Sequence, residues 1–165
     1  MNLVFRKATT QDIPLIAELA DSIWRKHYSD IITLQQIEYM LKNMYSEESI
    51  LQQIAEGHVF TIVYADEKAI GYVSTSTTDK RNYTLHKFYI SPDYHGNNIG
   101  TKLFTHLLSE LSPLESIQLT VNRQNYKAIN FYFKNGFVIK EIVDFNIGNG
   151  FFMNDFVMIK KNNTN

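Results

Sequence analysis

One stretch constrains the fold more than any other part of this sequence: Ser91 to Leu103, which reads SPDYHGNNIGTKL. An apolar run ends just before it, at Ile90, and a helical pattern of apolar residues begins within it, at Ile99. The junction is marked by small and amide residues, namely Gly96, Asn97, Asn98 and Gly100. Such a loop can expose several backbone N–H groups in a row, and those of the first helical turn point the same way. The stretch therefore predicts a strand, a turn and a helix whose N-terminus can bind a phosphate-bearing ligand.

The spacing of apolar residues predicts the order of the other elements. Apolar side chains recur at helical spacing up to Gly57, and from His58 the period becomes that of strands. The predicted elements are a strand at 3–6, a helix from Ile13 to about His27 with Asp12 as N-cap, a helix opened by Thr33, a helix opened by Ser46 and ended by Gly57, strands at 58–65, 69–78 and 83–90, a helix at 99–111, a strand at 117–121, a helix at 125–135 with Gly136 at its C′ position, and strands at 137–145 and 151–160. This order predicts an α/β fold with one mixed sheet and helices on its faces.

Length and composition predict a single domain over residues 1–165. A chain of this size can bury roughly 70% of its unfolded surface, and its 44% of hydrophobic residues supply an ordinary core. The last five residues, 161–165, are polar or charged, and we expect them to form a frayed tail.

Charge and cysteine content exclude several classes of function. With 16 basic and 17 acidic residues the chain lacks the basic footprint of a nucleic-acid or membrane-surface protein, so neither partner is expected. The absence of cysteine excludes disulfides, Cys-ligated zinc and a Cys nucleophile. His27, His58 and His106 do not have the spacing of metal ligands, so no metal is expected. With no apolar segment of about 18 residues, we expect a cytoplasmic protein.

The loop at 96–100 matches neither of the two common nucleotide-binding motifs. A P-loop requires GxxxxGK[ST], whereas here the glycines are four apart and Thr101 precedes Lys102. A dinucleotide fingerprint lies in the first βαβ unit, whereas this loop follows three strands. By spacing alone, the loop could also be a plain strand-to-helix turn.

A second motif distinguishes these alternatives. Residues 121–137 read VNRQNYKAINFYFKNGF, about 25 residues after YHGNNIGTKL. Together the two motifs resemble the GCN5-related N-acetyltransferase (GNAT) family, which has a Q/R-x-x-G-x-G/A loop for acetyl-CoA and an N-x-x-A-x-x-(F/Y)-Y-x-x-x-G-F helix. The second motif matches at Asn125, Ala128, Phe131, Tyr132, Gly136 and Phe137. The resemblance covers residues 6–160 and implies the GNAT fold, a central twisted mixed sheet flanked by helices.

Two residues depart from the family's loop motif. His95 stands where Gln or Arg is usual, and Asn98 where the middle Gly is usual. Because Asn tolerates a positive φ better than most residues, the loop can still form. His95 has fewer donors than Arg, so we expect a weaker but intact site.

The resemblance implies a role for several residues. The backbone of the strand end, Phe88, Tyr89 and Ile90, would pair with the pantetheine arm of acetyl-CoA and orient its thioester. Asn125 would contact the arm, and Tyr132 would stabilise or protonate the leaving thiolate. The pyrophosphate would be held by His95, Gly96, Asn97, Asn98, Ile99, Gly100 and Thr101.

The chemistry of these groups limits the mechanism. With no cysteine to carry an acetyl group, direct attack by an amine is the simplest route. A phenol of pKa ~10 protonates a thiolate of pKa ~8.5 uphill by ~2 kcal/mol, so Tyr132 would act mainly as a hydrogen-bond donor. An amine of pKa ~10.4 loses its proton at pH 7 at a cost of ~4.6 kcal/mol, so His86 or a water chain is expected to act as base. The structural alternatives are a core aromatic for Tyr132 and an ordinary strand histidine for His86.

The acceptor is less specifically indicated than the cofactor. Trp24 and Tyr28 could line an acceptor pocket, although Trp24 could equally be a core residue, and Asp155 or Asp144 could attract a cationic amine. The segments 24–41 and 148–158 are similar to the polyamine-acetylating branch of the family. We therefore expect transfer of acetyl to a primary amine, with a polyamine as the specific hypothesis, by a monomer or homodimer. The alternative is a non-catalytic acyl-CoA-binding module.

Overall fold

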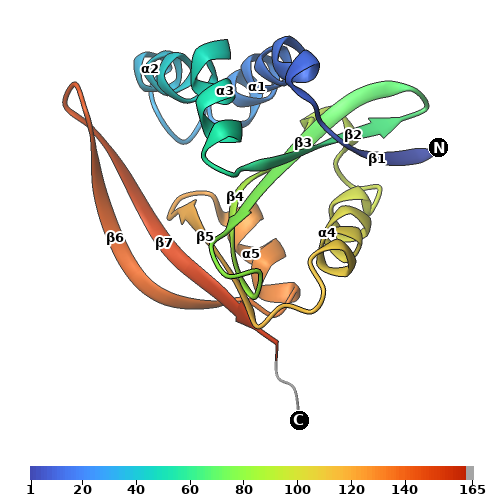
Figure 1. Cartoon of the computed structure of the whole chain (residues 1–165). Helices are drawn as coiled ribbons and strands as arrows, with labels where there is room; N and C mark the ends of the chain where they lie inside the picture. Colours follow the sequence, from blue (N-terminus) through green and yellow to red (C-terminus); the bar gives the residue numbers. More distant parts are fainter. Residues whose placement is uncertain (163–165) are drawn as a thin grey trace. The chain divides into compact units, whose positions relative to one another are not determined.

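The structure is a computed structural model that describes residues 1–162 (Figure 1). The element order confirms the sequence prediction. The elements are β1 (Leu3–Lys7), the 3₁₀ turn η1 (Thr10–Asp12), α1 (Ile13–His27), α2 (Leu34–Tyr45), α3 (Glu47–Ala55), β2 (Val59–Ala65), β3 (Lys68–Thr77), β4 (Asn82–Ile90), the 3₁₀ turn η2 (Pro92–Tyr94), α4 (Ile99–Glu110), β5 (Ser116–Asn122), α5 (Tyr126–Lys134), β6 (Val138–Gly148) and β7 (Phe151–Lys161).

The strands form one mixed sheet, as expected. Its order is β1-β2-β3-β4-β5-β7-β6. The pairs β1–β2, β2–β3, β5–β7 and β6–β7 are antiparallel, whereas β4 and β5 are parallel. The parallel ladder joins Asn82–Thr84 to Ser116–Gln118, and both strands run on beyond it, to Ile90 and Asn122.

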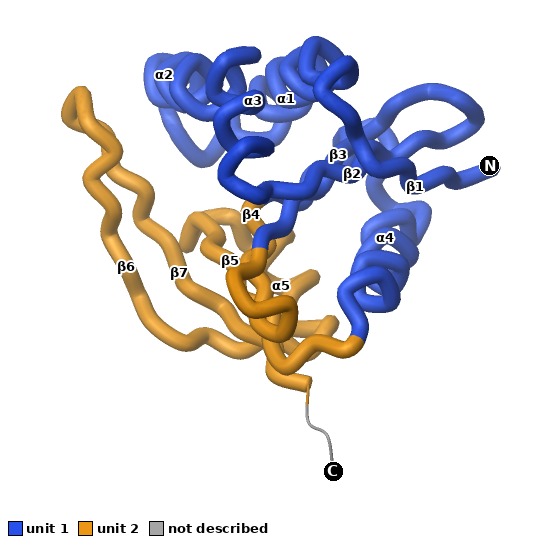
Figure 2. The backbone as a smooth tube through the Cα atoms, viewed as in Figure 1, with its two compact units in different colours: residues 1–76, 87–112 blue, residues 77–86, 113–165 orange. Residues whose placement is uncertain are grey.

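The chain divides into two compact units, which are described separately (Figure 2). Unit 1 comprises residues 1–76 and 87–112, and unit 2 comprises residues 77–86 and 113–165. The prediction of a single domain therefore remains a prediction. Strand β4 contributes its first half to unit 2 and its second half to unit 1.

Unit 1 contains β1–β3, the end of β4 and helices α1–α4. Its core includes the fully buried aliphatic side chains of Ile16, Ile62, Val63 and Leu103. On one side Tyr72 of β3 packs against Tyr45 of α2, with ring centroids 5.8 Å apart. On α4, His106 packs against Phe5 of β1 at 4.8 Å.

Unit 2 contains the start of β4, strands β5–β7 and helix α5. Its buried side chains include Ile117, Leu119, Phe137 and Met158. Leu119 and Met158 are register partners on β5 and β7, so their side chains share a face of the sheet.

The side chains that cap the helix N-termini are those predicted from the sequence, with one exception. Thr33 and Ser46 accept hydrogen bonds from the N–H groups of Gln36 and Ser49, both at 3.2 Å, as expected of N-caps. Asp12 is the N-cap residue of α1, as predicted, but within residues 1–162 its side chain makes no capping hydrogen bond to the helix. Its carboxylate accepts instead from the Thr9 N–H and from the guanidinium of Arg6, both at 2.8 Å. The hydrogen bonds from Arg6 are the main cause that lowers the pKa of Asp12 to about 2.

The predicted tail begins too early. Lys161 is the last residue of β7, and the Asn162 backbone N–H donates to the carbonyl of Glu115 at 2.8 Å. The rest of that prediction, residues 163–165, lies outside the described residues.

Candidate active site

The loop between β4 and α4 has the backbone conformation that an anion-binding loop requires. Gly96 has φ +90° and Asn98 has φ +57°, ψ +17°, so the Asn that replaces the usual glycine does adopt the left-handed region. Asn98 is also the N-cap residue of α4, and in the described chain its side chain makes no capping hydrogen bond. The N–H groups of the first turn of α4 are therefore not capped by this side chain, and they lie at the positive end of a 12-residue helix.

The His95 side chain turns back toward β4. Its Nε2 lies 2.9 Å from the carbonyl oxygen of Ile90, and its backbone N–H donates to Pro92 at 3.2 Å. In the tautomer that carries the proton on Nε2, the ring ties the loop to the last residue of the strand. The predicted contact of His95 with pyrophosphate remains a prediction, and the backbone N–H groups are the donors that the loop offers more directly.

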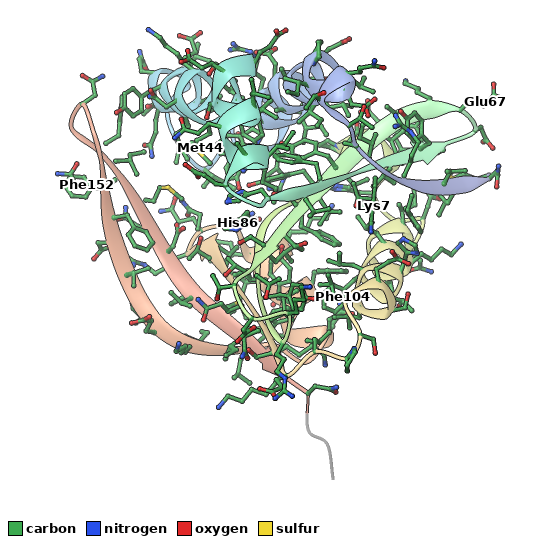
Figure 3. All side chains as sticks on the ribbon, viewed as in Figure 1. Lys7, Met44, Glu67, His86, Phe104 and Phe152 are labelled. Atoms are coloured by element: carbon green, nitrogen blue, oxygen red, sulfur yellow. The ribbon has the colours of Figure 1, made fainter. Side chains whose placement is uncertain are left out.

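The end of β4 is packed on both faces within unit 1. Phe88 contacts Phe104 of α4, with ring centroids 6.2 Å apart (Figure 3 labels Phe104). Tyr89 points the other way, and its hydroxyl lies 3.0 Å from that of Tyr28 at the end of α1. The Ser91 N–H donates to the carbonyl of Ile70 on β3 at 2.8 Å. The strand end therefore has little freedom to move.

An aromatic cluster surrounds Tyr89 on the side of α1 and α2. Trp24 is only 2% exposed, and its ring centroid lies 4.5 Å from that of Tyr28 and 5.5 Å from that of Tyr45. Trp24 is thus a core residue, the alternative that its sequence position left open. The Tyr72 hydroxyl donates to that of Tyr45 at 2.9 Å, and burial raises the pKa of both phenols well above the usual value. Both therefore stay neutral.

Sequence reasoning missed a buried lysine in the same unit. Lys87 is 5% exposed, and its Nζ donates to Oε1 of Gln53 at 2.7 Å. The ammonium also lies 5.4 Å from the ring centroid of Tyr45 and 5.5 Å from that of Phe60. Burial lowers the pKa of Lys87 to about 8. A signal existed in the strand alternation, since Lys87 falls between Leu85 and Tyr89 on the face that carries their side chains.

Helix α5 of unit 2 explains the second sequence motif, the one that runs from Asn125 to Phe137. The Asn125 side chain caps the helix, accepting from the Ala128 N–H at 3.3 Å. At the other end the N–H of Gly136 donates to Phe133 at 3.1 Å and that of Phe137 donates to Tyr132 at 3.0 Å. These two bonds form a Schellman motif, with Gly136 at φ +90°.

The two capped ends of helix α5 fix the position of Tyr132. Its ring packs against that of Phe137, with centroids 5.4 Å apart, and the residue is 7% exposed. The motif N-x-x-A…Y-x-x-x-G-F is therefore a pair of helix caps that fixes where this tyrosine sits. Asn125 itself is 5% exposed, and its predicted contact with the cofactor arm remains a prediction.

His86 and Asp155 also belong to unit 2. His86 is exposed on the first half of β4 (Figure 3), and its predicted role as the base remains a prediction. Asp155 on β7 is 2% exposed, and burial raises its pKa to about 6. A hydrogen bond from Thr120 and the positive charge of Arg123 act in the opposite direction and lower the pKa, but burial has the larger effect. Arg123 pairs with Asp144, Nη2 to Oδ1 at 2.8 Å. Asp144 is therefore paired with Arg123, and the predicted role of either carboxyl in attracting a cationic amine remains a prediction.

Two further expectations concern metals and membranes. In residues 1–162 no group of three or more His, Cys, Asp or Glu side chains is arranged to hold a metal ion. The longest helix, α1, has 15 residues, and within the described chain no helix has the length and apolar character needed to cross a bilayer.

Comparisons with known proteins agree with the motifs. Residues 28–151 match the family model described as an acetyltransferase (GNAT) domain. A spermidine N(1)-acetyltransferase of Thermoplasma acidophilum is 28% identical over 169 aligned positions, which cover 98% of each chain. The PaiA N-acetyltransferase of the same organism, solved in complex with coenzyme A, has a TM-score of 0.82 at 27% identity and covers 98% of this chain and 100% of its own.

A GCN5-related N-acetyltransferase from Rhodopseudomonas palustris shares the fold, with a TM-score of 0.79 at 19% identity over 98% of this chain and 96% of its own. Because the family model covers most of the sequence, the chain belongs to the GNAT acetyltransferase family. It is an N-acetyltransferase, and enzymes of this family use acetyl-CoA as donor. The predicted family, fold and enzyme class are confirmed.

Proposed function

We propose that this protein transfers the acetyl group of acetyl-CoA directly to a primary amine. The observation that carries the proposal is the loop before α4. Gly96 and Asn98 have positive φ angles there, and in the described residues the Asn98 side chain does not cap the helix. The backbone N–H groups at the N-terminus of α4 can therefore bind an anion. That chemistry suits a pyrophosphate. Residues 95–101 would hold it, mainly through the backbone.

Each residue then has a defined task. The backbone of Phe88, Tyr89 and Ile90 orients the thioester, which supplies an activated acetyl group. The Tyr132 hydroxyl donates a hydrogen bond to the sulfur as the carbon–sulfur bond breaks. The attacking amine forms the new carbon–nitrogen bond and gives its proton to His86 or to a water chain.

For the acceptor we propose a cationic amine, with a polyamine such as spermidine as the specific candidate. The Thermoplasma acidophilum relative that acts on spermidine supports this, at 28% identity over nearly the whole chain. In unit 2 the carboxyl of Asp155, with a pKa of about 6, is mostly ionised at neutral pH and can attract an ammonium group. Tyr28 offers an aromatic face for a cation at the end of α1.

The experiment is a thiol-release assay with acetyl-CoA and a panel of amines at matched ionic strength. The panel contains spermidine, spermine, a monoamine and a neutral amino acid. We expect kcat/KM for spermidine to exceed that for the neutral amino acid by at least about tenfold, which corresponds to about 1.4 kcal/mol of additional attraction in the transition state. Equal rates for the two would contradict the polyamine assignment.

The same assay separates the enzyme from a binding module. His95 and Asn98 depart from the family loop, and the His95 ring is engaged with Ile90. If coenzyme A raises the melting temperature but no amine in the panel is acetylated, the protein is an acyl-CoA-binding module and the proposed transfer is wrong.

A further inference from the structure

Gly71 lies on β3 at a point where the backbone of β4 comes unusually close. A Cβ atom on Gly71 would lie 2.3 Å from the carbonyl oxygen of Tyr89 and 3.0 Å from the Cα of Ile90. Both are backbone atoms, which cannot rotate away as the end of a side chain can. Gly71 does not have a positive φ. Glycine is therefore required here for space rather than for backbone conformation.

A β-bulge prepares this close approach. In the β2–β3 ladder Val63 is opposite Gly71 and Tyr64 is opposite Ala69, so Ile70 is the extra residue of β3. The carbonyl of Ile70 accepts the hydrogen bond from Ser91 at 2.8 Å. The bulge and the glycine after it therefore contact three consecutive residues of unit 1, 89 to 91.

The same segment is held from two other directions. The Tyr28 hydroxyl lies 3.0 Å from that of Tyr89, and Nε2 of His95 lies 2.9 Å from the carbonyl oxygen of Ile90. Residues 89–91 therefore contact the end of α1, strand β3 and the loop before α4, and these contacts together hold their backbone in place. Any change at Gly71 is then transmitted to the peptide between Tyr89 and Ile90.

We propose that Gly71 is a positioning residue for acetyl transfer, because its missing side chain lets the Tyr89–Ile90 backbone lie where it orients the thioester. The inference rests on the proposed function, which gives that backbone its role. A methyl group at Gly71 must displace the strand by about 0.7 Å, the difference between 2.3 Å and the 3.0 Å below which Cβ contacts are not found. Misplacement by about 1 Å costs up to about a hundredfold in rate.

The test compares the wild-type protein, Gly71→Ala and the control Gly57→Ala. Gly57 has φ +99°, and no atom lies within 4 Å of the position that a methyl group would take there, so alanine strains the backbone without displacing a neighbour. For each protein kcat and KM come from thiol release with the best amine, the Kd for coenzyme A from calorimetry, and Tm from a thermal melt. The control accounts for general destabilisation, expected as a fall in Tm of roughly 3–5 °C.

We expect Gly71→Ala to lower kcat by about 10- to 100-fold, with KM for the amine and Kd for coenzyme A changed less than about threefold. Gly57→Ala should keep the wild-type kcat. The proposal is overturned if Gly71→Ala keeps kcat within twofold, or if the two variants lose activity equally. It is also overturned if Gly71→Ala shows no cooperative melt, because Gly71 would then be needed for folding rather than for placement. A wild-type protein that turns over no amine refutes the proposed function instead.

Discussion

Replacing Lys87 with Met is expected to stabilise the protein at neutral pH, although it removes a hydrogen bond. The residue is 5% exposed, and its ammonium contacts Gln53 at 2.7 Å and two aromatic rings. Met retains most of the length of the lysine stem and carries no charge. The Gln53 amide keeps its other bonds, from Nε2 to Met44 at 2.7 Å and to Ser49 at 3.1 Å.

The magnitude follows from the pKa of Lys87. Burial lowers it from 10.5 to about 8, which is about 2.5 units and corresponds to about 3 kcal/mol against the charged form. At pH 7 the lysine is charged in both the folded and the unfolded protein, so this cost is fully present. The lost hydrogen bond and cation–π contacts offset about 1–2 kcal/mol. We therefore expect Lys87→Met to gain about 1–2 kcal/mol in the free energy of unfolding at pH 7.

The gain should depend on pH with a definite sign. Between pH 8 and 10.5 the folded wild-type protein has lost the Lys87 proton while the unfolded chain still binds it. Because the unfolded state then holds more protons, wild-type stability from this group rises with pH across the window. The advantage of Lys87→Met should shrink from pH 8 upward and disappear or reverse near pH 10.5.

Urea denaturation at pH 7, 8, 9 and 10 measures this difference. The fluorescence of Trp24 reports unfolding, because it is the one tryptophan of the sequence and is buried. Lys42→Met, at an exposed lysine of α2, is the matched control for exchanging a lysine for methionine. The reasoning is refuted if Lys87→Met is less stable than the wild type at pH 7, or if the difference stays constant up to pH 10.

Substitutions at three further positions test the loop, the helix cap and the buried carboxyl. Asn98→Gly should leave the Kd for coenzyme A within about twofold in calorimetry, whereas the β-branched Asn98→Val should raise it at least about tenfold, because a positive φ is required; equal effects would contradict this. Asn125→Ala should cost about 1 kcal/mol in urea denaturation and Asn125→Asp much less, since aspartate also caps; equal losses would show that capping is not the cause. Asp155 has a raised pKa, so between pH 3.8 and about 6 the folded state keeps a proton that the unfolded chain loses, and stability from this group falls as pH rises. Asp155→Asn should therefore melt higher than the wild type at pH 7 and lose that advantage below pH 4, whereas a pH-independent difference would contradict the pKa assignment.

Local signals in the sequence predicted those parts of the molecule that depend on local interactions. The caps at Thr33 and Ser46 are decided by hydrogen bonds three residues away, so sequence spacing reveals them. The second motif likewise predicted α5, because Asn125 and Gly136 act within one turn of the helix ends. Asn98 was expected to tolerate a positive φ from its residue type alone, and it does.

The features that the sequence did not predict depend on contacts between residues that are distant in the sequence. Asp12 was expected to cap α1, but the guanidinium of Arg6 on β1 competes for its carboxylate. Lys161 was expected to fray, but it pairs with β5 at Ser116. The burial of Lys87 depends on Gln53, 34 residues away, and the need for glycine at 71 depends on β4. The alternation of β4 places Lys87 on the buried face, but no local pattern predicts its contact with Gln53 or the close approach of β4 to Gly71.

The most direct test of the proposed transfer is the kcat of Tyr132→Phe with acetyl-CoA and spermidine. Phenylalanine keeps the ring that packs against Phe137 at 5.4 Å and removes only the hydroxyl. If that hydroxyl stabilises the leaving thiolate, kcat falls by about 100-fold or more, while the Kd for coenzyme A and the melting temperature stay close to those of the wild type. A kcat within about threefold of the wild type would contradict the assignment of Tyr132 as the donor to the leaving thiolate.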